Sequence, residues 1–377
     1  MRASIHFCLV LSMAGLQSTR AQIPPSIEFS VPKPPTVANS DSGAFLSYEL
    51  HVTNLTAAPV TLRGIEVFDA DRQAPVFTLN DGVAPLSRVI GRPGPPVPTT
   101  EAATIGAGLR AYVYLWIPVD PKHPPGRLEH RLVFQRGTDT NRVVLTGARI
   151  PVTREAVTIS PPIRGEWAAF NGPSNSSGHR RLVLALEGHA AIGQRFAIDY
   201  LQVDSSGASH RGDAADNANY YDYGTELHAV ADGVIAAVKD SIPQNVPGAT
   251  SRAVPITMET VGGNFVAIDI GGGKYALYAH VQPGSLRVKV GDHVKRGQVV
   301  ALLGNSGNST EPHVHFQIAD GPSFLAAEGL PYATDFDVVG QCGIVTENGR
   351  AAVKCTRHAP VRVHDGIPLQ NELVRFP

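Results

Sequence analysis

Apolar and polar side chains alternate strictly along residues 46–53. The apolar set is Leu46, Tyr48, Leu50 and Val52, and the polar set is Ser47, Glu49, His51 and Thr53. A period of two predicts a β-strand that buries one face and exposes the other. Comparable apolar runs follow at 60–67, 112–117 and 128–134, with Pro and Gly between them. Residues 22–155 are therefore predicted to form an immunoglobulin-like β-sandwich, an accessory domain that carries no cluster of chemically active side chains.

The pattern changes after the segment Ser160-Pro-Pro162, where a second domain is expected to begin. Histidines become frequent, and residues 262–280 are predicted to form a hairpin whose second strand ends at His280. The last segment, from about residue 333, is expected to consist of short strands and loops that close the domain. Because proline-rich junctions usually cross few core contacts, residues 160–377 are expected to fold without the sandwich.

Composition supports an all-β fold and argues against nucleic-acid binding. Charged residues make up 17% of the chain, against about 25% in ordinary soluble domains. The chain contains 37 Gly and 30 Pro, which favours strands joined by many turns over a helical protein. With 32 Lys and Arg against 33 Asp and Glu, the net charge is −1. A protein that binds nucleic acid by neutralising phosphates is normally basic, so no nucleic-acid partner is expected.

The N-terminus predicts export. Arg2 supplies a positive start, residues 5–16 are largely apolar, and Thr19-Arg20-Ala21 offers small residues at the positions that precede a cleavage site. Residues 1–21 are therefore predicted to be a signal peptide. No later stretch approaches the 18 apolar residues of a membrane span, so no membrane anchor is expected and the protein should be periplasmic or secreted.

The chain contains three cysteines, and the first, Cys8, would leave with the signal peptide. The other two, Cys342 and Cys355, are separated by twelve residues. Cysteines this close in an exported protein are expected to form a disulfide bond. Zinc binding by the pair is less expected, because no CxxC spacing is present.

Two histidines two residues apart are the strongest candidates for chemistry. His313 and His315 would point to the same face of a strand. In such a pair one imidazole can bind zinc, while the other transfers protons or orients water. His280 closes another predicted strand of the same unit, which adds a third imidazole.

These residues stand in two runs that resemble a known family. The runs GGNFVAIDIGGGKYALYAHV and VKVGDHVKRGQVVALLGNSGNSTEPHVHFQI look like the lysostaphin-type (LytM-like) zinc endopeptidases, which are peptidoglycan hydrolases. The likeness is dense over residues 233–318 and defines a motif core at 177–320. It implies a β-barrel-like duplicated hybrid motif domain, zinc (Zn2+) as cofactor and a peptidoglycan peptide as substrate. It also implies that His315 binds zinc and that His313 and His280 are catalytic.

The family also has an upstream His-x-x-x-Asp, both residues of which bind zinc, and the chain departs from it there. Asp199 matches the aspartate, but the position four residues earlier is Arg195. A guanidinium has no acceptor atom and cannot bind a metal. Arg195 must therefore point away from the site, or pair with Asp199 in a site that holds no metal.

Two other segments offer a replacement histidine. A strand beginning near His179 should return through residues 194–200, and in one register His179 and Asp199 share a face. His179 is thus a candidate for the missing zinc ligand. The alternative is His210-Arg-Gly-Asp213, a shortened version of the motif, in which the acid would lie on the opposite strand face.

Three functions remain open. The first is an exported zinc endopeptidase of the cell wall. The second is a degenerate family member that binds or activates another hydrolase, which Arg195 favours. The third is a carrier or adhesion module on a lipoyl-like barrel, although no lysine stands at the hairpin tip and the histidines would have no role. The sequence leaves the oligomeric state open.

Overall fold

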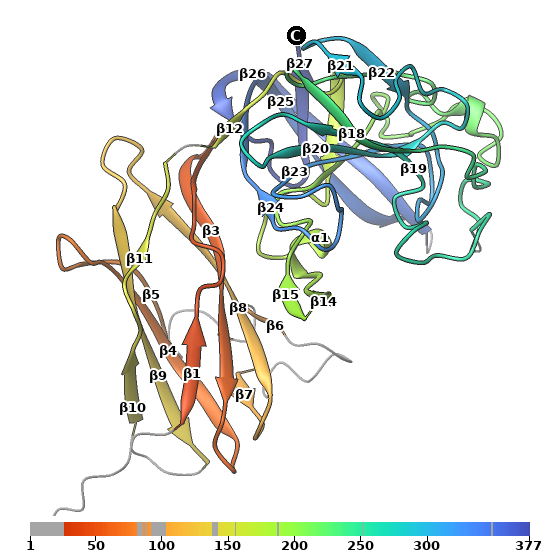
Figure 1. Cartoon of the computed structure of the whole chain (residues 1–377). Helices are drawn as coiled ribbons and strands as arrows, with labels where there is room; N and C mark the ends of the chain where they lie inside the picture. The colour runs from red at the N-terminus through yellow and green to blue at the C-terminus, as the bar shows by residue number, and fades with distance from the viewer. Residues whose placement is uncertain are drawn as a thin grey trace, which may run out of the picture.

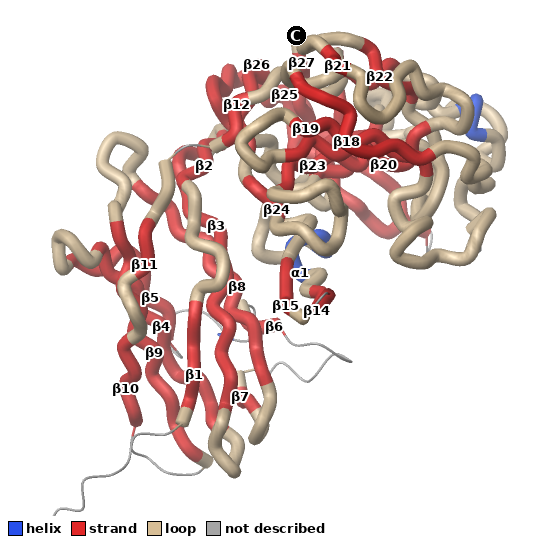
Figure 2. The backbone as a smooth tube through the Cα atoms, viewed as in Figure 1, coloured by secondary structure: helices blue, strands red, loops and turns tan. Residues whose placement is uncertain are grey.

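The computed structural model describes residues 26–80, 86, 89–91, 103–137, 142–154, 156–186, 188–250, 252–347 and 350–377. Within them almost every regular element is a strand, and the helical segments are α1 (Gly178–Arg181) and η2 (Asn217–Asn219), as Figure 2 shows. The predicted all-β class is confirmed. The predicted signal peptide lies outside the described residues. None of the helices in the described part of the chain is long and apolar enough to cross a bilayer.

Two facing sheets form the N-terminal part (Figure 1). The first contains β1 (Ile27–Ser30), β2 (Val37–Ser40), β3 (Gly43–Asn54), β6 (Ile90–Gly91) and β8 (Arg110–Val119). The second contains β4 (Val60–Asp69), β5 (Ala74–Asn80), β7 (Thr104–Ile105), β9 (Arg127–Arg136), β10 (Arg142–Thr146) and β11 (Ile150–Pro151). Apolar residues from both sheets form one core, which is the arrangement of a sandwich.

The strand β3 departs from its prediction in one respect. Its apolar positions are buried as expected, but Ser47, Glu49 and His51 on the polar face are buried as well. This face is buried because the C-terminal part packs on β3 and β8, through the side chain of Arg180 and through Val183 and Ile192. A face that alternation alone assigns to solvent is therefore an interface.

One long sheet runs through the C-terminal part, and a short pair of strands, β17 (Glu226–His228) with β22 (Val299–Leu302), accompanies it. The order along the sheet is β12 (Val157–Thr158), β25 (Tyr332–Glu347), β27 (Glu372–Phe376), β13 (Gly165–Phe170), β16 (Ile198–Leu201), β23 (Val314–Ala319), β20 (Tyr275–Val281), β19 (Asn264–Asp269), β18 (Gly233–Lys239) and β21 (His293–Val294). Two further strands pair at its sides, β24 (Gly329–Leu330) and β26 (Arg350–Gly366). The hairpin of β14 (Leu184–Leu186) and β15 (His189–Ala191) projects toward the sandwich (Figure 1).

The last segment is more regular than predicted. Instead of short strands and loops, β25 and β26 form a long antiparallel hairpin of 16 and 17 residues. Cys342 and Cys355 face one another directly in this pairing and form a disulfide bond. The predicted disulfide is thus confirmed, and it joins the two strands of one hairpin.

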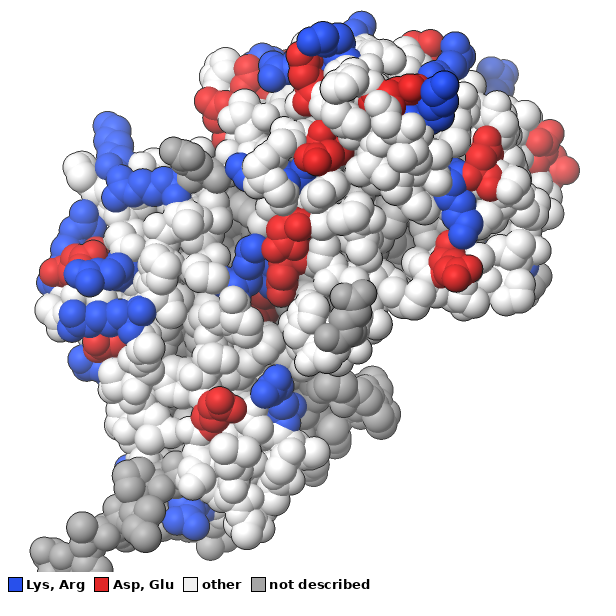
Figure 3. Space-filling model, viewed as in Figure 1, with Lys and Arg blue, Asp and Glu red and all other residues white. Residues whose placement is uncertain are grey.

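The junction between the two parts is not a bare linker. Ala38 and Phe45 of the sandwich belong to the same hydrophobic core as Ile159 of the C-terminal part. The amide of Ile367 donates to the carbonyl of Asn39, and charged side chains of both signs stand where the two parts meet (Figure 3). The expectation that few core contacts cross this junction is therefore wrong, although independent folding of residues 160–377 stays a prediction.

The pH dependence of stability should reflect a buried histidine of the sandwich. Desolvation lowers the pKa of His130 from 6.5 to about 4, and the ring contacts the Tyr48 hydroxyl at 2.7 Å. The unfolded chain therefore binds a proton at a higher pH than the folded chain, so the free energy of unfolding should fall as the pH drops from about 6.5 to about 4. The substitution His130→Gln should flatten this part of the profile in urea titrations. It should not abolish the slope, because burial also lowers the pKa of His51 to about 4. Equal slopes for both proteins would contradict the assignment.

Candidate metal centre

Strand pairing brings the candidate aspartate and histidine together. β16 and β23 are antiparallel neighbours, and Asp199 lies directly opposite His315 in their register. β20 pairs with β23 on its other side, with Ala279 opposite His315. Regular alternation would turn His280 to the other face, but its φ of 62° breaks the strand geometry, and its ring centre lies 6.1 Å from that of His315. Three strands that are distant in sequence thus deliver three of the predicted site residues to one side of the sheet.

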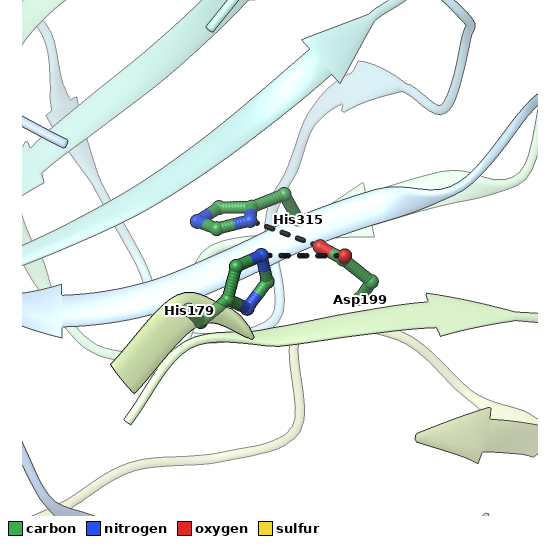
Figure 4. Close-up of side chains that lie close together, drawn as sticks. All are labelled: His179, Asp199 and His315. Carbon is green, nitrogen blue, oxygen red and sulfur yellow. Dashed lines mark hydrogen bonds and ion pairs between the residues drawn. The ribbon is translucent and has the colours of Figure 1, made fainter. Parts of the chain in front are cut away.

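His179, Asp199 and His315 form a compact group (Figure 4). The His179 Nε2 lies 3.3 Å from Asp199 Oδ2, and the His315 Nδ1 lies 2.9 Å from Asp199 Oδ1. One ligand atom from each residue falls within 4.8 Å of the others. Donor atoms around a tetrahedral zinc with bonds of about 2.0 Å are about 3.3 Å apart, so the group needs little movement to hold the ion.

His179 reaches this group by a different route from the one predicted. It lies on the single helical turn α1, where the Arg181 amide donates to the Ser177 carbonyl, and not on a strand. The predicted strand is restricted to β14, which pairs with β15 and not with the segment 194–200 that was expected to be its partner. The prediction that His179 and Asp199 lie together is nevertheless confirmed.

Gln317 determines which nitrogen of His315 is available. Its amide nitrogen donates to the carbonyls of Gly193 and Phe324, so its oxygen is the atom that faces His315 Nε2, at 2.8 Å. An amide oxygen only accepts, so Nε2 carries a proton, and Nδ1 is the nitrogen that faces the Asp199 carboxylate. The 2.9 Å contact between Nδ1 and the carboxylate oxygen is favourable with a proton or a metal ion between them. Sequence analysis missed Gln317, although the positions 313, 315 and 317 share one period of two.

The carboxylate of Asp199 is also held from its other side. Asn171 directly follows β13 and donates from Nδ2 to Asp199 Oδ2 at 2.8 Å. Burial alone would raise the pKa of Asp199, but the nearby imidazoles of His179, His313 and His315 hold it well below its ordinary value. The group is therefore an anion, which is the form in which a carboxylate binds a metal. No sequence signal pointed to Asn171.

His280 and His313 stand beside the group without joining it. The His280 Nδ1 donates to the Ser306 carbonyl at 2.8 Å, and the His313 Nδ1 donates to the Glu311 carbonyl at 2.9 Å. Each ring therefore keeps its Nε2 as an acceptor, and the two ring centres are 4.7 Å apart. Burial, followed by the neighbouring His313 and His315, lowers the pKa of His280 well below its ordinary value. His280 also has a φ of 62°, and such strain in a non-glycine residue persists where the surrounding structure imposes it.

Arg195 points away from the cluster, as the first of its two alternatives predicted. Its Nε lies 2.8 Å from Glu49 Oε2 and its Nη1 lies 2.6 Å from Glu328 Oε2, both away from Asp199. The alternative pair His210 and Asp213 does not reach the cluster, since the ring of His210 packs on Tyr220 and Asp213 is exposed. The structure thus favours His179 over His210 as the partner of Asp199.

Comparison with known proteins identifies the domain. Residues 219–325 match the family described as Peptidase family M23. This stretch includes His280, His313 and His315, whereas His179 and Asp199 precede it. The chain is 33% identical over 107 residues to Endolysin 2638A of Staphylococcus phage 2638A, covering 26% of this chain and 22% of the endolysin. It is 44% identical over 57 residues to lysostaphin of Staphylococcus staphylolyticus, covering 15% of this chain and 12% of lysostaphin.

Among solved structures, a mutant catalytic domain of the prophage-encoded M23 protein EnpA from Enterococcus faecalis is similar at 23% identity and a TM-score of 0.28. That similarity covers 46% of this chain and 93% of the EnpA domain. The chain spans about a fifth of the length of the endolysin and about an eighth of lysostaphin, so the likeness is confined to one domain. Residues 219–325 thus match Peptidase family M23, and the chain is similar there to the lysostaphin-type peptidases.

Proposed function

We propose that the chain is an exported zinc-dependent endopeptidase that cleaves peptide bonds of peptidoglycan. Zinc would be held by His179, Asp199 and His315. The observation that carries this proposal is the position of His315 Nδ1, which faces a carboxylate that also contacts His179, while Gln317 holds the other ring nitrogen. Two imidazoles and a carboxylate are a common set of protein ligands for a catalytic zinc, which keeps one position open.

The state of the imidazoles agrees with this proposal. Burial lowers the pKa of His179 to about 4, although the charge of Asp199 opposes the shift. The ring is therefore neutral near pH 7 and has a lone pair to give. When bound, zinc supplies an activated water and polarises the carbonyl of the substrate.

His280 and His313 supply the proton chemistry in this proposal. Both rings are anchored through Nδ1 to backbone carbonyls, so each Nε2 has a fixed direction. The low pKa of His280 keeps its ring neutral, so that it can accept a proton at Nε2. Once protonated, either ring can donate to the developing oxyanion or to the leaving amine.

The surroundings of the cluster suit an extended peptide. The five residues line a cleft with a volume of about 430 Å³, together with Arg252 and Thr310. A second hollow of similar volume adjoins it and shares its walls at Val261, Gly262 and Phe324. A continuous hollow of this kind can hold several residues of a peptide on either side of the bond that is cleaved.

Digestion of purified peptidoglycan tests the proposal. The full chain, loaded with zinc, should release peptides with new amino termini detectable by mass spectrometry, and chelation should stop the release. The variant His179→Ala should be inactive, whereas His189→Ala, which replaces an exposed histidine, should be as active as the parent. An inactive parent would favour the alternative of a binding partner or activator of another hydrolase.

Removal of Gln317 should weaken zinc binding without removing a ligand. In Gln317→Ala the His315 ring loses the acceptor that holds its Nε2 proton, so both nitrogens compete for that proton. Groups that orient a metal ligand typically contribute about 10–100-fold to affinity, and a loss of that size is expected. Competition with a chromogenic chelator measures it, with the exposed Gln341→Ala as the control. An affinity equal to that of the parent would show that Gln317 does not set the tautomer.

A further inference from the structure

A single carboxylate of the sandwich binds both segments that carry His179 and Asp199. Glu49 on β3 is 3% exposed, and its Oε1 accepts from Arg180 Nε while its Oε2 accepts from Arg195 Nε, each at 2.8 Å. Arg180 is the residue next to His179. Arg195 lies in the turn that leads into β16, four residues before Asp199. The segments that carry two of the three proposed zinc ligands are therefore each bound, through an arginine, to the same acid.

Arg180 is anchored more firmly than an ordinary ion pair requires. Its Nη2 donates to the carbonyls of Tyr48 and Leu115, both at 2.9 Å, and its Nη1 donates to Asn175. The side chain is fully buried and lies over the ring of Tyr114. These contacts join α1 to the two central strands of one sandwich sheet, β3 and β8.

The turn α1 has little stability of its own. It contains four residues, and isolated helices shorter than about 12–15 residues are marginal in water. No side chain caps its N-terminus. The position of His179 must therefore come from tertiary contacts, and Arg180 supplies several of them to the sandwich.

Paired charges stabilise this attachment. Two buried guanidiniums face the carboxylates of Glu49 and Glu328, so the four charges balance. Breaking a buried ion pair leaves an uncompensated charge, which is much more costly than losing a surface pair. Separation of the sandwich from α1 would break the ion pairs of Glu49 with both arginines. It would also remove the contacts that hold His179 in position.

We propose that Glu49 is a positioning residue of the metal site and that docking of the sandwich is coupled to zinc binding. This inference rests on the zinc site proposed above. The sandwich then does more than space the domains, because it holds two ligand segments in place. Coupling is reciprocal, so zinc must in turn strengthen the docking of the sandwich. His315 and His280 come from β23 and β20 and have no contact with Glu49 among those described, so their positions should not depend on it.

Conservative substitutions in the full chain test the coupling. Glu49→Asp retracts the carboxylate so that it cannot reach both arginines, and Arg180→Lys keeps the charge but loses the forked donors. The controls are Glu166→Asp and Arg357→Lys, because Glu166 also bridges two arginines, Arg357 and Arg375, and none of the three lines the cleft. Zinc affinity is measured by competition with a chromogenic chelator. Both test variants should bind zinc at least about tenfold more weakly than the parent, and both controls within about twofold.

Hydrogen exchange of the parent gives a second measurement that needs no substitution. Addition of zinc to the chelator-treated chain should slow amide exchange in β3 and α1 together. Unchanged exchange in β3 would overturn the coupling even if the variants fail to fold. If the parent binds zinc and the test variants bind it equally well, the inference fails while the zinc site stands. If the parent itself binds no zinc, the zinc site fails and the inference falls with it.

Discussion

Replacing His315 by alanine should abolish stoichiometric zinc binding. The substitution removes the Nδ1 lone pair and leaves His179 and Asp199 as the remaining donors of the cluster. Because groups that only orient a ligand already contribute about 10–100-fold, loss of the ligand itself should cost more than about 100-fold in affinity. Cleavage of peptidoglycan should be lost with the metal.

Metal analysis after dialysis against a metal-free buffer measures this effect. The control is His293→Ala, which removes an exposed histidine from β21 and should keep one zinc per chain. Circular dichroism of the His315→Ala variant should show an unchanged β-sheet spectrum. Retention of one zinc per chain by His315→Ala would contradict the ligand assignment, whatever its activity.

Removal of His313 or His280 should affect catalysis and not zinc binding. His313→Ala and His280→Ala should retain zinc, because neither side chain belongs to the group of three donors. They should lose activity, because each removes an anchored Nε2 that can accept or donate a proton. A general acid or base typically contributes about 10²–10⁴-fold to the rate, and a loss in that range is expected for each variant.

Parallel measurements of zinc content and of the initial rate of peptide release separate the two roles. The expected pattern is full zinc with a low kcat for both variants, against no zinc for His315→Ala. The His313 Nε2 lies 3.6 Å from Asp199 Oδ1, so its removal is the stricter test of the boundary between ligand and catalytic group. Loss of zinc from His313→Ala would place His313 among the ligands.

The HxH pair could be predicted because alternation along a strand puts His313 and His315 on one face. Asp199 was identified through the resemblance to the lysostaphin-type endopeptidases, and not from a local rule. Chemistry excluded Arg195 as a metal ligand but left open whether it points away or pairs with Asp199, and its contacts with Glu49 and Glu328 decide this. The short turn α1 could not be predicted, because its conformation is set by Arg180 docking on another domain.

The role of Glu49 could not be predicted either, because it also depends on contacts between the two parts of the chain. Its place in an alternating strand predicted exposure to solvent, and only the packing of the C-terminal part on β3 reverses that expectation. Gln317 and Asn171 act through single hydrogen bonds whose partners are far away in sequence. Contacts between domains and orienting hydrogen bonds have no periodic signature, whereas strands and ligand pairs do.

Anomalous diffraction from crystals of the zinc-loaded full chain tests the central claim most directly. The account predicts one zinc peak per chain, about 2.0–2.2 Å from His179, Asp199 and His315, with Arg195 still paired to Glu49. A chain without a zinc peak, or a zinc ion bound without His179, would contradict it.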